Sequence, residues 1–291
     1  MSPKSRSAYL FVAPAVLLFA FTILVPIVMT FAFSFYDWNG FGAMNFVGLD
    51  NYARAFHDRI YWSSYSHILI YIIATVFLEV LVGLCLAGLI TMGRKGSSLF
   101  RIAFFTPVML PMIVVSYIWR FVYNSDFGLL NSILTAVGLE SWTNVWLGNP
   151  NTALLAICLV SGWVYAGFYM TIFYSGIQRI PKDVYESAYL DGATEWTIFT
   201  KIKMPMIRGL VDTGVMLCVL TGFQAFDLFY VMTNGGPYNS TEIVTTYLVK
   251  VVFNNMSIGY GSALAVIMTV VIAVIGLLAG KLQRKDNSLE Y

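Results

Sequence analysis

Six apolar runs of about 20 residues or longer divide this chain and limit what it can fold into. They lie at about residues 9–33, 65–90, 102–122, 152–174, 210–232 and 262–282. As a helix, each is long enough to cross a hydrocarbon core of ~30 Å. We therefore predict an all-α polytopic membrane protein with six transmembrane helices, folded as a single transmembrane domain over residues 1–291.

The composition agrees with a membrane protein. Of the 291 residues, 58% are hydrophobic and 11% are charged, and the mean hydropathy is +0.74. A soluble domain carries about a quarter charged residues. The first apolar run is too long for the core of a secretory signal, and no convincing small-residue cleavage site follows it. We expect this run to remain as a membrane span.

The positions of Lys and Arg predict the orientation of the chain. If successive connecting segments lie on alternate sides of the membrane, thirteen of these 17 residues fall on one side. They are Lys4, Arg6, Arg94, Lys95, Arg101, Arg179, Lys182, Lys201, Lys203, Arg208, Lys281, Arg284 and Lys285. Basic residues are enriched in cytoplasmic segments. We predict that both termini and the segment between the fourth and fifth spans are cytoplasmic.

A polar stretch at residues 181–205 carries strong helix signals. Pro181 suits the first turn of a helix, and Asp183 favours the positive end of the helix dipole. Gly192 is expected to end this helix in the left-handed conformation. Thr194 is suited to cap a second short helix that ends at or just before Pro205. The stretch therefore predicts two short helices at an angle, within a loop over residues 178–208.

This stretch resembles the EAA loop of the membrane subunits of ABC importers. The matching positions are Glu186, Ser187, Ala188, Gly192, Ile202, Met204 and Pro205. Ser187 stands for the first alanine of the pattern and Met204 for its leucine, and both are similar enough in size to keep the resemblance. In that family the loop is the part of the permease that binds the ATPase subunit. Without a partner, the same residues also suit two amphipathic helices lying on the membrane surface.

Flanking segments resemble the sugar-permease branch of the same family. They are Ile180-Pro181, Asp191-Gly192-Ala193, residues 46–52 and residues 259–263. With these segments, the resemblance extends over nearly the whole chain.

Residues for covalent chemistry are not gathered in any recognisable pattern. His57 and His67 have no accompanying Cys or carboxylate pattern that would make a metal site. The sequence has no phosphate-binding loop, because Gly93-Arg94-Lys95-Gly96-Ser97 lacks the required spacing. Cys85, Cys158 and Cys218 fall inside predicted spans and are interpreted as packing residues. We expect a transport subunit without enzymatic activity, metal or bound cofactor.

Polar residues inside the apolar runs are candidates for a solute pathway. Ionisable side chains are costly in a membrane and usually face a cavity or a partner, as expected here for Glu79 and Asp227. For Glu79, pairing with a neighbouring helix and a functional role are equally plausible. Arg120 is near the outer end of its span and is expected to reach water.

The fifth span carries the predicted substrate pathway. On a continuous helix, Thr221, Gln224 and Asp227 would fall within a sector of about 120°, with Phe223 and Phe226 beside them. Such a polar strip also suits simple helix–helix contact. Trp163 and Tyr165 on the fourth span are further candidates, because sugars pack on aromatic rings, although interfacial aromatics also occur without a ligand.

The resemblance implies a permease subunit of an ABC importer for a sugar or oligosaccharide, in the cell membrane. It implies as partners a second homologous permease, two cytoplasmic ATPase subunits that use ATP and Mg, and an extracytoplasmic solute-binding protein, with no nucleic acid. The alternatives are a permease for a glycerol-phosphate-like solute and a stand-alone secondary transporter of a polar solute. A membrane enzyme is a third, which would need clustered His, Asp or Glu.

Overall fold

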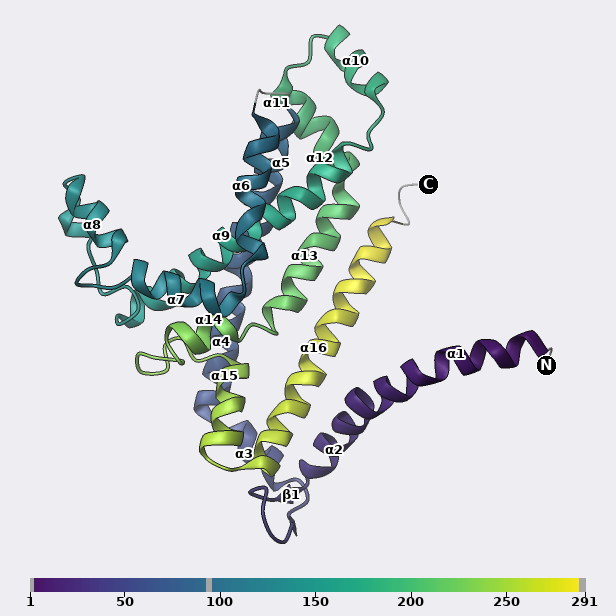
Figure 1. The fold of residues 1–291 in the computed structure, drawn as a ribbon, viewed down its shortest axis with the longest axis vertical. Helices are drawn as coiled ribbons and strands as arrows, with labels where there is room; N and C mark the ends of the chain where they lie inside the picture. Colours follow the sequence, from purple (N-terminus) through teal and green to yellow (C-terminus); the bar gives the residue numbers. More distant parts are fainter. Residues whose placement is uncertain (1–2, 93–95, 288–291) are drawn as a thin grey trace. The chain divides into compact units, whose positions relative to one another are not determined.

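A computed structural model describes residues 3–92 and 96–287 of the chain (Figure 1). Arg94 and Lys95, which contribute to the predicted orientation, lie outside the described residues. The described part is helical apart from one antiparallel strand pair, β1 (Tyr36–Asp37) with β2 (Asn45–Phe46), in which Tyr36 is opposite Phe46. The predicted all-α membrane fold is confirmed.

The chain divides into two compact units. The first holds residues up to 59 and residues 247–271, and the second holds residues 60–246 and the chain from 272 on. Elements of the first unit are α1 (Pro3–Phe19), the π-helical turn η1 (Ala20–Leu24), α2 (Val25–Phe33), α3 (Asp50–His57) and the π-helical turn η6 (Lys250–Asn254). Within this unit the hydroxyls of Tyr247 and Tyr260 both donate to the Asp58 carboxylate. This carboxylate therefore ties α3 to the chain that follows residue 246.

The second unit begins with the α4 to α9 segments. They are α4 (Arg59–Thr75), the π-helical turn η2 (Val76–Leu81), α5 (Val82–Thr91), α6 (Ser97–Phe105), the 3₁₀ turn η3 (Thr106–Met109), α7 (Met112–Val122), α8 (Leu129–Ala136), the 3₁₀ turn η4 (Glu140–Trp142) and α9 (Pro150–Ile177). Then follow α10 (Lys182–Leu190), α11 (Glu195–Ile198), the π-helical turn η5 (Phe199–Lys203), α12 (Met204–Met206), α13 (Arg208–Gly222) and α14 (Asp227–Met232). The helices α15 (Val244–Val249) and α16 (Ile258–Asn287) are divided between the units, and α4 begins with the last residue of the first unit's N-terminal part.

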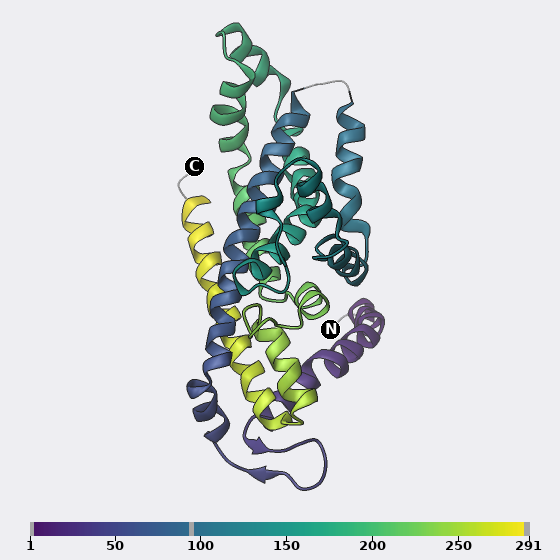
Figure 2. The ribbon, with the colours of Figure 1, turned by 90° about the vertical axis from the view of Figure 1, so that its left-hand side faces the viewer.

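Helix α9 forms the centre of the second unit. It packs against α5, η2, α6 and η3, and Figure 2 shows the blue helices beside the teal α9. The closest approach is at Gly167, where a Cβ atom would lie 1.8 Å from the carbonyl oxygen of Phe104. Met170 and Phe173 follow on α9 and are fully buried. Glycine at residue 167 therefore lets α6 contact α9 backbone to backbone, as small residues do between membrane helices.

Four helices of the described part are long and apolar enough to cross a membrane by themselves. They are Phe11–Phe33, Arg59–Thr91, Pro150–Ile177 and Ile258–Lys281. The number rises to six if each of two bent helix pairs is taken as one span. The six-span topology is compatible with this result and stays a prediction.

The predicted third span, residues 102–122, is not one continuous helix. Its two parts, Ser97–Met109 and Met112–Val122, meet at an angle of 101°. Leu110 is extended, with ψ 138°, and Pro111 follows with ψ 132°. Proline disfavours the helical conformation of the residue before it and has no N–H to donate, which explains a break at this point in an otherwise apolar run.

Residues 210–232, the predicted fifth span, are likewise not one continuous helix. Helix α13 ends at Gly222, and α14 begins at Asp227. In the turn between them the amide of Gln224 donates to the Thr221 carbonyl, and the amide of Ala225 donates to that of Gly222. These bonds span three residues instead of four, and glycine is a weak helix former, so the helix ends here.

Candidate functional site

The two short helices predicted within residues 178–208 are present as α10 and α11. Pro181 directly precedes α10 with ψ 140°, one position before the place predicted for it. Gly192 has φ +77°, the left-handed conformation that favours glycine. The Thr194 hydroxyl caps α11 by accepting a hydrogen bond from the Thr197 amide. The sequence signals for this loop therefore correspond to local structure.

The second helix passes the predicted end at Pro205. It continues from α11 through η5 into α12 and ends at Met206. In η5 the Met204 amide donates to the Phe199 carbonyl, five residues back, and Pro205 follows in the first turn of α12. Pro205 has no N–H to donate within this helix, and it follows directly on the π-helical turn, where the hydrogen bonds already depart from the regular four-residue pattern.

The residues of the EAA pattern differ in their exposure. Glu186, Ser187 and Gly192 are exposed, as is Pro205, whereas Ala188 is buried and Ile202 is half-buried. The Ser187 hydroxyl donates to the backbone carbonyl of Asp183, so this hydroxyl already has a hydrogen-bond partner within α10. Glu186 is thus presented on the surface of α10, while Ala188 holds this helix to the protein. Leu190, at the end of α10, is 89% exposed.

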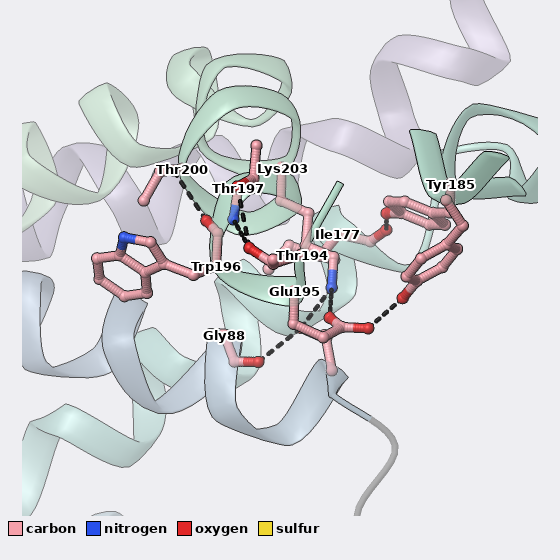
Figure 3. A network of polar contacts seen from close by, with 11 residues as sticks. Gly88, Ile177, Tyr185, Thr194, Glu195, Trp196, Thr197, Thr200 and Lys203 are labelled. Carbon is pink, nitrogen blue, oxygen red and sulfur yellow. Dashed lines mark hydrogen bonds and ion pairs between the residues drawn. The ribbon is translucent and has the colours of Figure 1, made fainter. Parts of the chain in front are cut away.

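A buried lysine connects the loop to the membrane helices. Lys203 has only 4% of its surface exposed, and its Nζ atom lies 3.7 Å from Oε2 of Glu195 (Figure 3). The same Nζ donates to the hydroxyl of Thr91 at the end of α5, at 3.3 Å, and lies 5.3 Å from the ring centroid of Tyr185. The network therefore joins η5, α11, α10 and α5. Neither Lys203 nor Glu195 belongs to the EAA pattern, and sequence reasoning missed this role for both.

Glu195 makes contacts on both sides. Its Oε1 atom accepts a hydrogen bond from the hydroxyl of Tyr189, which raises the pKa of that tyrosine above its ordinary value. Its Oε2 atom is buried without a hydrogen-bond partner, so the ion pair with Lys203 compensates it. The nearby Tyr185 hydroxyl donates to the Ile177 carbonyl at 3.2 Å, and burial raises the pKa of Tyr185. These bonds fix α10 and α11 to each other and to the end of α9.

A cavity of about 410 Å³ lies within the second unit, away from the loop. Its lining includes Tyr71, Thr75 and Glu79, which follow one another at four-residue steps along α4 and η2 and so share one helix face. This spacing was a signal in the sequence, although only Glu79 was singled out. Ser161 of α9 and Cys218 of α13 are next to these residues in the lining.

Glu79 is fully partnered in this cavity. It is 5% exposed and accepts a hydrogen bond from the Ser161 hydroxyl at 2.7 Å on Oε1. The Cys218 thiol lies 3.6 Å from Oε2, and the hydroxyls of Tyr71 and Ser161 are 2.8 Å apart. Glu79 therefore links three helical segments and also lines the cavity. The two interpretations that the sequence left open are both compatible with this geometry.

Most of the predicted pathway residues meet at this cavity. Its lining includes Thr221, Gln224, Phe226, Asp227 and Tyr165. They do so around the turn between α13 and α14 and not along one helix face, so the predicted placement on a continuous helix is wrong. The break directs these residues to a common cavity instead.

Two predicted pathway residues lie elsewhere. Phe223 is 1% exposed and does not line the cavity. The ring of Trp163 packs edge-on against that of Trp119, with centroids 5.6 Å apart.

Arg120, near the end of α7, donates to the Val231 carbonyl at 3.3 Å. Within residues 3–92 and 96–287 no three His, Cys, Asp or Glu residues are grouped as metal ligands.

Comparisons with known proteins identify the family. Residues 79–285 match the family model described as binding-protein-dependent transport system inner membrane component. The chain belongs to this family. This membership confirms the predicted family and makes the chain an ABC transporter permease, a membrane transport subunit and not an enzyme.

Relatives match over almost the full length. A probable ABC transporter permease of Bacillus subtilis, YurN, is 34% identical over 94% of each chain. The probable starch degradation products transport system permease AmyD of Thermoanaerobacterium thermosulfurigenes is 30% identical, over 95% of this chain and 94% of that one. A chain of a bacterial ABC transporter involved in the import of the acidic polysaccharide alginate superposes with a TM-score of 0.88, at 19% identity, over 97% of this chain and 96% of that one. This structural match shows that the fold is that of an ABC transporter permease.

Proposed function

We propose that this permease forms half of the translocation pathway of an ATP-driven importer for a sugar or oligosaccharide. The observation that carries the proposal is the cavity of the second unit. The rings of Tyr165 and Phe226 line it beside Thr221 and Gln224. Sugar C–H groups pack on aromatic rings, while sugar hydroxyls need hydrogen-bonding partners. The names of AmyD and of the alginate transporter support a saccharide cargo.

The exposure of the pathway residues supports an aqueous route. Thr221, Gln224 and Asp227 are exposed in this chain. A carboxylate at membrane depth is costly against lipid and is found facing water or a protein partner. A second, homologous permease would supply the opposite wall of the pathway. Within this chain we retain the single permease domain over residues 1–291 as part of the proposal.

The cytoplasmic loop would connect transport to ATP hydrolysis. Exposed Glu186 and Leu190 on α10, with Trp196 (68% exposed) on α11, offer an acidic and apolar surface to an ATPase. Two such subunits would use ATP and Mg, and an extracytoplasmic solute-binding protein would deliver the cargo. In this arrangement the loop and both termini are cytoplasmic.

Transport assays on the assembled importer test the proposal. Gln224→Ala should lower solute uptake at least about tenfold, by loss of hydrogen bonds to the cargo, while the affinity of the solute-binding protein and the basal ATPase rate stay measurable and similar. Thr213→Ala is the matched control, because Thr213 is an exposed polar residue of α13 outside the cavity lining. Unchanged uptake by a Gln224→Ala, Thr221→Ala double variant would remove this cavity from the pathway.

A further inference from the structure

We infer that the cavity selects against anionic solutes and admits neutral or cationic ones. This inference rests on the proposed function, because it concerns the charge of the cargo that passes the same cavity. Its basis is an imbalance of charge in the lining. Glu79 and Asp227 both line the cavity, whereas the lining contains no Lys, Arg or His among the residues that the structure describes.

The hydrogen-bond partners of Glu79 are neutral. Its Oε1 atom accepts from the Ser161 hydroxyl, and its Oε2 atom lies 3.6 Å from the Cys218 thiol. Neither partner offers a positive charge that would attract an anion. An anion entering the cavity would meet the two carboxyl groups in a space partly enclosed by protein, where Coulomb repulsion is stronger than in bulk water.

Asp227 places a second carboxylate in the lining. It is exposed and follows the turn that carries Gln224. The aromatic residues Tyr165 and Phe226 in the lining add to the preference, because the negative face of an aromatic ring attracts cations. Negative charges and ring faces therefore act in the same direction on a charged solute.

The described lining lacks the basic side chains that commonly hold an anionic solute. Phosphate and carboxylate groups are often bound by Arg or Lys side chains. The cavity offers hydroxyl, amide and carboxylate groups from its described residues. A permease for a glycerol-phosphate-like solute is therefore the less suitable interpretation. A transporter of an acidic polysaccharide shares the fold, but this cavity is unsuited to such a cargo.

Charged thiol reagents test the inference without knowledge of the cargo. The full importer is assembled with Gln224→Cys, in a background in which Cys85→Ala, Cys158→Ala and Cys218→Ser remove the native thiols. Modification rates are measured with a trimethylammonium-ethyl and a sulfonato-ethyl methanethiosulfonate of similar size. Each rate is divided by the rate of the same reagent with 2-mercaptoethanol. The cationic reagent should then react on the order of tenfold faster than the anionic one, as one or two carboxylates nearby would cause.

Neutral variants separate the contribution of this chain from that of its partner. Adding Asp227→Asn or Glu79→Gln should lower the ratio of cationic to anionic rates at least about threefold. Asp212→Asn is the control, since Asp212 pairs with Arg208 on α13 and does not line the cavity. It should leave the ratio unchanged. Should Gln224→Cys prevent assembly, Thr221→Cys reports on the same cavity.

The outcomes distinguish the inference from the function on which it rests. Equal normalised rates, or a faster anionic reagent, would overturn the charge selectivity while leaving the pathway in place. Failure of both reagents to modify Cys at residues 224 and 221 in every nucleotide state would show that the cavity is closed to water. The proposed function of this cavity would then fail, and the charge inference with it.

Discussion

Glu186 and Glu195 show how two nearby carboxylates take different roles. Glu195 is held by Tyr189 and Lys203, so it is committed to contacts within the chain. Glu186 is exposed on α10 within the EAA pattern. An exposed carboxylate contributes little to the stability of the fold itself, and surface substitutions usually change it by less than ~0.5 kcal/mol. Glu186 is therefore a carboxylate of this loop that is suited to an external partner.

Glu186→Ala should uncouple transport without affecting insertion. We expect normal amounts of the assembled permease in the membrane and loss of solute uptake, because the proposed contact with the ATPase is lost. Uptake and membrane levels are measured together. Glu140→Ala, which removes an exposed carboxylate outside this loop, should transport normally. Wild-type uptake by Glu186→Ala would contradict the proposed role of Glu186 in binding the ATPase.

Gly192 provides a test of backbone conformation in the same loop. A Cβ atom at residue 192 would meet nothing within 4 Å, so only its φ of +77° opposes a side chain. Gly192→Val should therefore lose about 1–2 kcal/mol in this conformation and shift α10 against α11. Gly192→Asn should be tolerated, because asparagine adopts the left-handed region more readily. Uptake per assembled complex should fall for valine and not for asparagine; equal uptake by both would show that the angle between the helices is not critical.

At the scale of elements, the network around Lys203 makes α10, α11 and η5 one unit. Glu195→Gln should destabilise this unit, because it leaves a buried ammonium group without a counter-charge. A loss of about 1–3 kcal/mol is expected, as for hydrogen bonds to charged groups. Thermal unfolding of the purified complex measures it.

A double variant distinguishes this ion pair from mere packing. Glu195→Gln combined with Lys203→Met removes both charges and retains side chains of similar size. Its loss of unfolding free energy should be smaller than the sum of the losses in the two single variants, since neither charge is left without its partner. Strictly additive losses would mean that Lys203 and Glu195 act independently.

The elements also show where sequence reasoning succeeds and where it fails. The loop was predictable because Gly192 and Thr194 act through local backbone chemistry. The helix interruptions at Pro111 and Gly222 were missed because the length and polarity of an apolar run are the same whether its helix is continuous or interrupted. The proline was visible in the sequence and was a usable signal.

The cavity required tertiary contacts that no single segment encodes. Its walls come from α4, η2, α9, α13 and the turn before α14. Glu79 and Asp227 were identified from polarity alone, but their common location depends on the break that separates Gln224 from α13. Ser161 and Cys218 were not singled out as site residues, because small polar side chains in an apolar run usually serve packing.

At the scale of the whole molecule, orientation is testable by labelling. The excess of Lys and Arg on one side predicts that both termini and the α10–α11 loop face the cytoplasm. A single cysteine replacing Ser187, in the cysteine-free background, should react with a membrane-impermeant thiol reagent only after the cytoplasmic side is exposed. Ser125 is exposed and follows the C-terminal end of α7. A cysteine at this position should react in intact cells. The opposite pattern would reverse the topology.

The exposed surface of this permease argues that it assembles with another chain. The span Phe11–Phe33 has none of its apolar window buried, which lipid is able to cover. Within the predicted fifth span, lipid would not compensate the exposed side chains of Gln224 and Asp227. A homologous permease facing the cavity would surround these groups with water and polar side chains.

Expression without that partner should therefore leave the chain unstable. We expect the level of tagged permease in the membrane to fall several-fold, and co-expression of the second permease to restore it. Asp227→Asn should lessen the dependence on the partner, because an amide costs less than a carboxylate to place against lipid, whereas Asp212→Asn should not. Native mass spectrometry of the purified importer gives the subunit composition directly. An active importer with two copies of this chain and no other permease would show that the cavity is completed by a second copy of itself.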